Sequence, residues 1–321
     1  MRGLLVLFLL SVHYSQVVYS QSNVSLLEEE LISGNGISSI TEWNHAFRGE
    51  EPAETGTMSL RANYDPNGYM VEETSFNSKG EQSRKVTSRF DNSGNRIQHS
   101  VYDLRNNRLT FSQAASFNQQ GNKISEWGFD GLGDYRNNYK YNSDGKVSEI
   151  QYTTQGSLSE RRVFTYIDNE TRVEVILPDN TIKERIILLN NNRGDLLLEA
   201  YYDNEQNLIR KVEYGYNASG LKTEERRYHG QQMQYRDAFI YENDLLQRII
   251  RTDRQGQETV INKYSYNTAG QLIEEAWYNE NADNYSTREY SWDDHGNMTS
   301  VECYFASYQF RVLYRYDYSF F

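Results

Sequence analysis

Residues 264–272 read Y-S-Y-N-T-A-G-Q-L, and this short phrase decides the fold because the chain repeats it. Its centre is an aromatic residue, then Asn or Asp, two variable residues and Gly. Copies of that centre begin at Tyr64, Phe76, Phe90, Phe117, Phe129, Tyr141, Tyr216, Tyr266 and Trp292. The strongest turns return about every 25 residues. A regular interval of this kind predicts a repeat architecture, in which each unit is one supersecondary element.

The phrase has the chemistry of a turn between two strands. Asn and Asp side chains accept a backbone N–H two residues on, and Gly supplies the positive φ at which the chain re-enters a strand. Before the turn, rings recur two residues apart, as at Tyr214 and Tyr216, which places both on one face of a strand. We therefore expect an all-β fold of about twenty antiparallel strands, with hairpin repeats of about 25 residues. These repeats would form a strongly curved sheet or a closed barrel-like shell, because closure removes exposed edges.

The first 56 residues differ from the repeats. Residues 1–20 have a positive Arg2, an apolar stretch over 3–12 and a small residue at Ser20, which predicts a signal peptide. We expect an exported protein that is secreted, periplasmic or at the cell surface. Residues 21–56 are expected to form an N-terminal cap, with a short helix from Asn23 or Ser25 to Leu31 and a strand over 37–43. Residues 57–321 form the repeat domain.

Composition limits the classes of function and partner. The chain has a formal net charge of −12. An acidic chain repels phosphate backbones, so we expect no nucleic acid as partner. No segment after the signal approaches the roughly 20 apolar residues of a membrane-spanning helix, so we expect no transmembrane helix. The single cysteine, Cys303, has no partner for an internal disulfide, and we expect it to be a buried residue on a strand over 301–305.

The repeated phrase resembles that of the YD-repeat (RHS-repeat) family of exported proteins. The resemblance is carried by residues 139–147, 264–272 and 290–298, and it extends over about 58–318. The unit here is longer, and Asn often replaces Asp. In size, the chain is more similar to an uncharacterised family of small exported bacterial proteins with a soluble porin-like β-barrel. The resemblance implies a β-shell that works outside the cytoplasm and binds glycan or protein, and it supplies no catalytic residue.

One unit departs from the pattern. The turn at 166–170 reads Y-I-D-N-E, and the next, at 189–194, reads L-N-N-N-R-G. Residues 182–189 are also the most aliphatic stretch of the chain. This unit is either a seam between subdomains or a more deeply buried pair of strands, and we favour the second.

Glutamates recur four to six residues after the turn glycines. They are Glu72, Glu126, Glu149, Glu199, Glu224, Glu274 and Glu302. A column of carboxylates is one way to bind Ca²⁺. The alternative, which we favour, is a solvated face balanced by Lys and Arg on adjacent strands. If the hairpin at Tyr266 closes symmetrically, Lys263 faces Glu274.

The sequence contains no motif that is typical of a catalytic or metal-binding site. The turn Asp293, Asp294, His295 and Gly296 holds too few ligands for a metal ion by itself. No nucleophile elbow, zinc-binding helix or phosphate loop occurs. We therefore expect no enzyme, no metal site and no cofactor.

Exposed aromatic rings are the best candidates for ligand binding. Trp43, Trp127, Trp277 and Trp292 could stack on sugar rings, although the period of two in the aromatic placement favours core packing. We predict non-enzymatic binding of a surface glycan or protein. Two alternatives stay open. One is an outer-membrane or envelope-associated structural barrel, which the alternating residues 314–321 resemble but the charged residues 81–89 oppose. The other is a carboxylate-dependent glycoside hydrolase.

Overall fold

The computed structural model describes residues 29–321. The expected signal peptide and the expected start of the first helix, at Asn23 or Ser25, lie outside these residues. The first described element is the helix α1 (Glu29–Gly34), and β1 (Ile37–Arg48) follows it, so the strand expected over 37–43 is present and longer. The remaining elements are β2 (Glu51–Pro52), β3 (Thr57–Tyr64), β4 (Met70–Phe76), β5 (Gln82–Phe90), β6 (Arg96–Asp103), β7 (Arg108–Phe117), β8 (Lys123–Phe129), β9 (Asp134–Tyr141), β10 (Val147–Thr154), β11 (Ser157–Ile167), β12 (Glu170–Ile176), β13 (Ile182–Asn190), β14 (Leu196–Asp203), β15 (Leu208–Tyr216), β16 (Lys222–His229), β17 (Gln232–Glu242), β18 (Leu245–Asp253), β19 (Glu258–Tyr266), β20 (Leu272–Asn279), β21 (Asn284–Trp292), β22 (Met298–Phe305), a short 3₁₀ turn (Ala306–Tyr308) and β23 (Phe310–Phe320).

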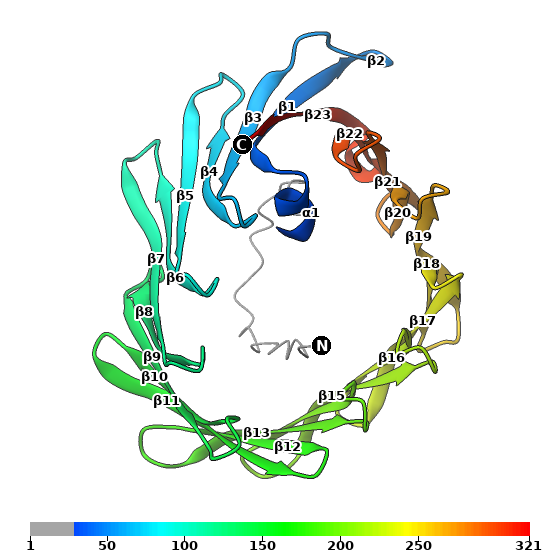
Figure 1. Cartoon of the computed structure of the whole chain (residues 1–321). Coiled ribbons are helices and arrows are strands. Elements are labelled where there is room, and N and C mark those ends of the chain that lie inside the picture. Colours follow the sequence, from blue (N-terminus) through cyan, green and yellow to red (C-terminus); the bar gives the residue numbers. More distant parts are fainter. Residues whose placement is uncertain (1–28) are drawn as a thin grey trace.

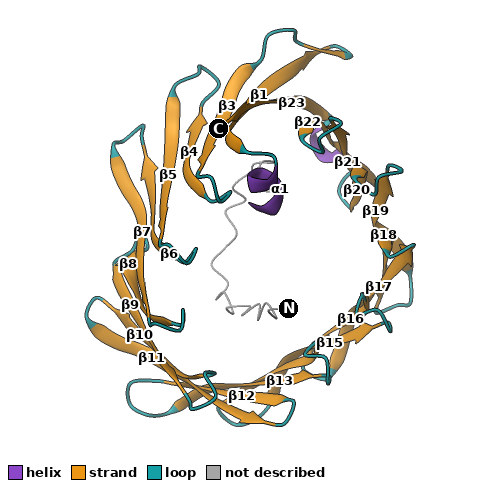
Figure 2. Cartoon of the chain, in the orientation of Figure 1, coloured by secondary structure: helices purple, strands orange, loops and turns teal. Residues whose placement is uncertain are grey.

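The strands form one closed antiparallel barrel (Figure 1). From β3 onward each strand pairs with the next along the chain, and β1 pairs with both β3 and β23, which closes the ring. Of the 23 strands, β2 pairs with the end of β1 beyond the wall, so 22 strands make the wall. Loops lie at the two ends of the strands (Figure 2). The predicted all-β fold of hairpin repeats is confirmed, and the shell is closed. Within residues 29–321 no helix has the length and apolarity needed to cross a membrane.

The repeated spacing of Asp or Asn and Gly builds turns with the predicted contacts. At the turn after β3, Asp65 Oδ1 accepts the backbone N–H of Asn67 at 2.9 Å and that of Tyr69 at 3.1 Å. Gly68 closes this turn with a φ of 86°. The same two contacts recur from His295 and Asn297 to Asp293. Oδ1 of Asp293, the first residue of the D-D-H-G turn, therefore already accepts two backbone hydrogen bonds.

A β-bulge follows most turns built on the phrase, although none follows the turn after Phe129, and it corrects one predicted contact. Ser265 pairs with Glu274, whereas the next residue, Tyr266, pairs with Leu272, so Ile273 is the extra residue. Lys263 is consequently opposite Ala276. The prediction that Lys263 faces Glu274 is wrong, because a bulge makes the hairpin asymmetric. Bulges also increase local twist and bending, which helps a sheet to close.

A ladder of side-chain hydrogen bonds ties the strands together at this end of the barrel. The aromatic residue before the turn donates to the carbonyl at the start of the preceding strand, at 2.6 to 2.9 Å. The donor and acceptor pairs are Tyr141 and Lys123, Tyr166 and Val147, Tyr216 and Leu196, Tyr241 and Lys222, Tyr266 and Leu246, Trp292 and Leu272, and Tyr318 and Met298. We call this set the rim ladder. It has gaps at β5, β7 and β13, where Phe90, Phe117 and Leu189 have no hydroxyl to donate.

The inner face of the wall is identified by α1, which lies inside the ring (Figure 1). Ile32 of α1 is buried in one cluster with Ile40, Leu60 and Val301. Partners in an antiparallel ladder share a face, so the pairing carries this inner face from strand to strand around the barrel. Cys303 belongs to the same cluster and is 2% exposed, as predicted, and burial raises the pKa of its thiol to about 11.

A second buried cluster lies across the barrel from α1. Val173, Val175, Ile186 and Tyr201 pack together on β12, β13 and β14. These strands contain the aliphatic stretch over 182–189. β13 has one buried residue, Ile186, and β1 and β22 have more, so the prediction of a more deeply buried pair of strands is not confirmed.

Candidate binding surface on the inner face of the barrel

Glutamates of the repeats sort onto the two faces of the wall by their distance from the turn glycine. Those five residues after the glycine face inward, because they pair with inner-face residues such as Ala62 and Tyr214. They are Glu73, Glu126, Glu199, Glu225 and Glu275. Those four residues after it, such as Glu72 and Glu224, point to the outer face, since successive side chains alternate.

Outer-face glutamates form ion pairs with residues of neighbouring strands or of their own strand. The Lys85 ammonium lies 2.8 Å from Glu72, and the Lys140 ammonium lies 3.0 Å from Glu149. The Arg226 guanidinium lies 2.6 Å from Glu224. These contacts fit the solvated, charge-balanced face that we favoured. The prediction that the recurring glutamates share one face is wrong for Glu126 and Glu199, which face the interior.

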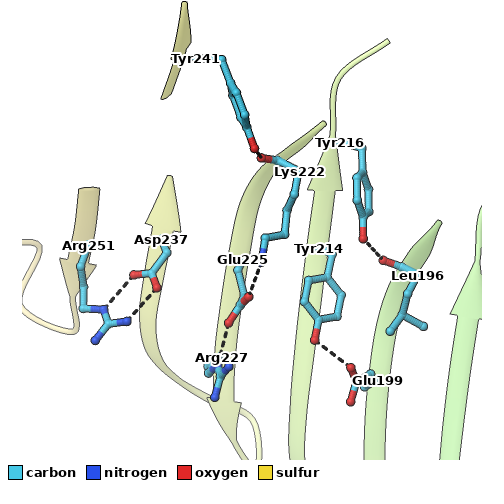
Figure 3. A network of polar contacts seen from close by, with 10 residues as sticks. All are labelled: Leu196, Glu199, Tyr214, Tyr216, Lys222, Glu225, Arg227, Asp237, Tyr241 and Arg251. Carbon is cyan, nitrogen blue, oxygen red and sulfur yellow. Dashed lines mark hydrogen bonds and ion pairs between the residues drawn. The ribbon is translucent and has the colours of Figure 1, made fainter. Parts of the chain in front are cut away.

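The densest set of polar contacts on the inner face spans β14 to β18 (Figure 3). The Tyr214 hydroxyl donates to Glu199 at 2.8 Å, and Arg227 Nε donates to Glu225 at 2.7 Å. Arg251 donates two hydrogen bonds of 2.8 Å to the two carboxylate oxygens of Asp237. We define the inner belt as Glu199, Tyr201, Arg210, Tyr214, Glu225, Arg227, Tyr235, Asp237 and Arg251.

Guanidinium groups of the inner belt also stack on its rings. The guanidinium of Arg251 lies 3.8 Å from the centre of the Tyr235 ring, and that of Arg210 lies 3.8 Å from the centre of the Tyr201 ring. A cation held over the face of a ring is attracted by the ring quadrupole. Each of these arginines is therefore held in one orientation along the inner face.

Burial divides the inner belt into a fixed base and an accessible layer. Glu225 and Asp237 are 8% and 6% exposed, whereas the side chain of Arg227 is 52% exposed. Burial raises the pKa of Glu225, but hydrogen bonds and charge from Arg227 and Lys222 outweigh it, so its pKa lies below the ordinary value. Burial, then the hydrogen bond to Glu199, raises the pKa of Tyr214 far above its ordinary value, so its hydroxyl remains a donor.

Charges of both signs are paired within the inner belt. Its three carboxylates are Glu199, Glu225 and Asp237, and its three guanidinium groups are Arg210, Arg227 and Arg251. The ammonium of Lys222, 3.0 Å from Glu225, adds one positive charge beside them. The inner belt is thus a hydrogen-bonding and aromatic patch without the net negative charge of the whole chain, which is −12.

The four candidate tryptophans are dispersed rather than gathered. Trp277 and Trp292 lie on the inner face: Trp277 packs edge-on against Phe305 at 6.2 Å, and Trp292 is a member of the rim ladder. Trp43 and Trp127 lie on the outer face. Trp43 donates to Asp317 at 2.7 Å, and Trp127 is 38% exposed. The structure therefore brings no two of them together in one site.

Sequence reasoning missed the inner belt, although a signal was present. Glu225 was left out of the recurring glutamates, and positions four, five and six after the glycine were treated as one column. In a strand the fifth position is on the face opposite to the fourth. Separating the positions by parity, with Tyr214 as the reference for the inner face, would have found Glu73, Glu225 and Glu275.

Comparison with known proteins matches the fold at low identity. Neither a protein-family model nor a curated protein matches the chain. Among solved structures, it is similar to TcdB2-TccC3 without the hypervariable C-terminal region, with 12% identity and a TM-score of 0.27 over 80% of this chain. The chain spans 19% of the length of that structure.

Two porin-like proteins are similar over nearly their whole length. The protein from Bacteroides uniformis has 9% identity and a TM-score of 0.28, covering 89% of this chain and 97% of that one. The protein from Bacteroides vulgatus has 10% identity and a TM-score of 0.24, covering 88% and 98%. Both kinds of protein that the repeated phrase resembles, an RHS-repeat shell and a porin-like β-barrel, are thus among the structural matches. The barrel assignment itself rests on the strand pairing described above.

Proposed function

We propose that this chain is a non-enzymatic barrel that works outside the cytoplasm and binds a surface glycan on its inner belt. The observation that carries the proposal is the set of rings, guanidinium groups and carboxylates held on one face of β14 to β18. Arg227 and Arg251 are anchored by Glu225 and Asp237, and both remain partly exposed.

The chemistry of the inner belt suits sugars. A sugar ring presents C–H groups, which pack on the faces of aromatic rings, and hydroxyls, which need both donors and acceptors. Tyr201 and Tyr235 supply rings, guanidinium N–H groups supply donors, and carboxylates supply acceptors. Because the charged groups of the inner belt are paired with one another, it offers donors and acceptors together, which suits the hydroxyls of an uncharged glycan.

Preorganisation supports a binding role. Each arginine is held by a ring or a carboxylate before any ligand arrives, so less side-chain freedom is lost on binding. The pairing of Arg227 with Glu225 and of Arg251 with Asp237 also lowers the free energy of the ionised carboxylates. A glycoside hydrolase needs one carboxyl group with a raised pKa to act as an acid. In the inner belt the pKa of Glu225 is lowered, and Glu42, whose pKa is raised, is buried on β1 outside the inner belt.

The outer face favours a barrel in water over one inserted in a membrane, which is the main alternative. Lys85 and Arg226 point outward from the middle of their strands and pair with glutamates, and Lys140 does so near the end of β9. Each Lys or Arg facing the middle of a bilayer costs about 2–4 kcal/mol. We expect the chain without residues 1–20 to remain in solution without detergent. Aggregation that detergent reverses would favour the envelope-associated alternative.

Two adjacent arginines provide a matched test of the glycan role. The purified chain is first screened on an array of neutral and charged surface glycans. The best ligand is then titrated against Arg227→Met, which alters the inner belt, and Arg226→Met, which alters the outer face next to it. We expect weaker binding by about tenfold for R227M and no change for R226M. Equal affinities, or binding only to proteins and to no glycan, would contradict the proposal.

A further inference from the structure

A pocket of about 640 Å³ lies at the rim of the barrel, separate from the inner belt, where three successive turns meet. It is lined by Asn169, by residues 190–193 and by residues 216–218, with Leu197. We propose that this pocket is a second site, which binds a single uncharged sugar residue. The inference rests on the proposed function for the ligand class, but it concerns different residues.

The pocket coincides with the unit that departs from the repeat. β11 ends at Ile167 and β12 begins at Glu170, so only two residues form that turn. The next turn, between Asn190 and Leu196, has five. The short turn leaves one side of the longer turn uncovered. The rim ladder also has a gap here, as it has at Phe90 and Phe117, because Leu189 has no hydroxyl to donate.

Amide groups dominate the pocket and retain hydrogen-bonding capacity. Asn169 Nδ2 donates to Asn192 Oδ1 at 2.7 Å, which leaves Asn169 Oδ1 as an acceptor and Asn192 Nδ2 as a donor. Asn217 Oδ1 accepts the backbone N–H of Leu221 at 2.9 Å, which leaves its Nδ2 as a second donor. These three remaining groups make no further hydrogen bond within residues 29–321. Neutral donors and acceptors on one wall match the hydroxyl pattern of a sugar.

The charge in the pocket is already satisfied. Arg193 donates to the carbonyl oxygens of Ala218 at 2.7 Å and of Asn217 at 3.2 Å. Its Nε donates to Asp195 at 3.0 Å. All three nitrogens of the guanidinium are therefore engaged, and Asp195 balances the charge. Arg193 thus links its own turn to the next one. Its charge is already paired, so it offers no free cation to an anionic sugar.

An apolar floor completes the pocket. The ring of Tyr216 is held by its hydrogen bond to the carbonyl of Leu196, and Leu197 lies beside it. The rim ladder thus fixes the ring before a ligand arrives. One ring face, one aliphatic side chain and several amides are the elements that hold a pyranose, packing its C–H face and bonding its hydroxyls.

A second pocket at the same end of the strands offers an internal control. It has a volume of about 570 Å³ and lies between the turns after β3 and β5. Its lining includes the charged residues Asp65, Arg89 and Asp91. Asn92 occupies the same place in its turn, next after the Asp, that Asn192 occupies after Asn191. The two asparagines therefore differ in their pocket and not in their place in the turn.

The test titrates the methyl glycosides of glucose, galactose and mannose, together with methyl glucuronide, by ligand-observed NMR. We expect millimolar binding of at least one neutral glycoside and no tighter binding of the glucuronide. Asn192→Ala is expected to weaken binding about tenfold, which corresponds to about 1.4 kcal/mol. Asn92→Ala is expected to leave it unchanged. Thermal denaturation establishes that N192A and N92A are equally folded, and Asn217→Ser provides a second change in the pocket.

Three results would overturn the inference. They are equal binding by N192A, N217S and N92A, binding of the glucuronide alone, and the absence of neutral-glycoside binding by the unaltered chain. The proposed function fails separately, through the R227M and R226M comparison. Loss of array binding in R227M together with unchanged glycoside binding in N192A would retain the inner belt and reject the pocket.

Discussion

The hydroxyl of Tyr216, at the end of β15, donates a hydrogen bond of 2.9 Å to the carbonyl of Leu196, the first residue of β14. This contact is one member of the rim ladder, which repeats the same link between neighbouring strands around much of the barrel. A β-bulge lies next to the acceptor carbonyl and disturbs the backbone hydrogen bonds between the two strands there. The aromatic residue of the phrase thus has a mechanical role beyond packing, since it satisfies a carbonyl beside the bulge.

Removing that hydroxyl should destabilise the barrel without changing its core. We expect Tyr216→Phe to lower the free energy of unfolding by about 0.5–1.5 kcal/mol, because the Leu196 carbonyl loses its donor. Urea denaturation measures the change. Tyr235→Phe is the control, because the Tyr235 hydroxyl makes no hydrogen bond to another group of residues 29–321. If Y235F lowered the free energy of unfolding as much as Y216F, the rim ladder would contribute nothing specific to stability.

The ion pair between Arg251 and Asp237 should be worth more than those on the outer face. Asp237 is 6% exposed, so Arg251→Met leaves a carboxylate with little solvent and without its two strongest donors. We expect R251M to lose about 2–3 kcal/mol, reduced from a fully buried pair because Arg251 is partly exposed. Arg226→Met on the outer face should lose less than about 1 kcal/mol.

A double variant separates the charge from the packing. Asp237→Asn in the R251M background removes the uncompensated charge, so it should restore part of the lost stability. Chemical denaturation of the two single variants and the double variant gives the coupling between the residues. If D237N lowered the stability of R251M further, the buried-charge explanation would be wrong.

Glu42 should make the barrel less stable as the pH rises. Burial raises the pKa of this carboxyl above its ordinary value of 4.5, and the opposing hydrogen bonds from Ser59 and Tyr316 do not reverse the shift. A raised folded pKa means that the protonated form is favoured in the barrel. Stability is then greatest below the unfolded value and falls as the pH rises through the folded value.

The variant Glu42→Gln removes this dependence while keeping the shape of the side chain. We expect E42Q to be more stable than the unaltered chain at pH 8 and to show a flatter profile above pH 4.5. Thermal denaturation across pH 4 to 8 measures both. An unchanged slope in E42Q would mean that other groups set the dependence.

Two glycines with similar φ distinguish backbone strain in a turn from contact of that turn with α1. Gly68 has a φ of 86° and Gly80 a φ of 77°. A Cβ added to Gly68 would lie 2.4 Å from the carbonyl oxygen of Glu29 in α1, whereas one added to Gly80 meets no atom within 4 Å. Both Gly→Ala changes should cost about 1–2 kcal/mol in backbone strain.

Only Gly68→Ala should also displace α1. Hydrogen exchange over residues 29–36 should become faster in G68A and remain unchanged in G80A. Equal exchange in the two variants would contradict the seating of α1 against this turn.

The sequence predicted the turns better than the register. The period of two placed Tyr214 and Tyr216 on one face, and the Asp65 and Gly68 chemistry follows from local preferences alone. The bulge after the turn places Glu274 opposite Ser265, so the expected contact between Lys263 and Glu274 was wrong. A symmetric hairpin is the simplest extrapolation from a turn motif, and the repeated phrase does not show where an extra residue enters the strand.

The site was harder to predict for a related reason. Which face of a strand is inside depends on the direction in which the whole sheet curves, and no single repeat contains that information. Trp43 and Trp127 were grouped with Trp277 and Trp292 by residue type, although the closed wall puts the first two on the outside. The pairing of Glu225 with Arg227 follows from the strand period, since residues two apart share a face. The pairing of Asp237 with Arg251 joins two strands and depends on their register.

The most direct test of the binding role is the structure of the chain bound to the glycan selected on the array. We expect a sugar ring inside the barrel, packed on Tyr235 or Tyr201, with its hydroxyls hydrogen-bonded to Arg227 or Arg251. A glycan seated on the outer face, or within the barrel but away from β14 to β18, would contradict it.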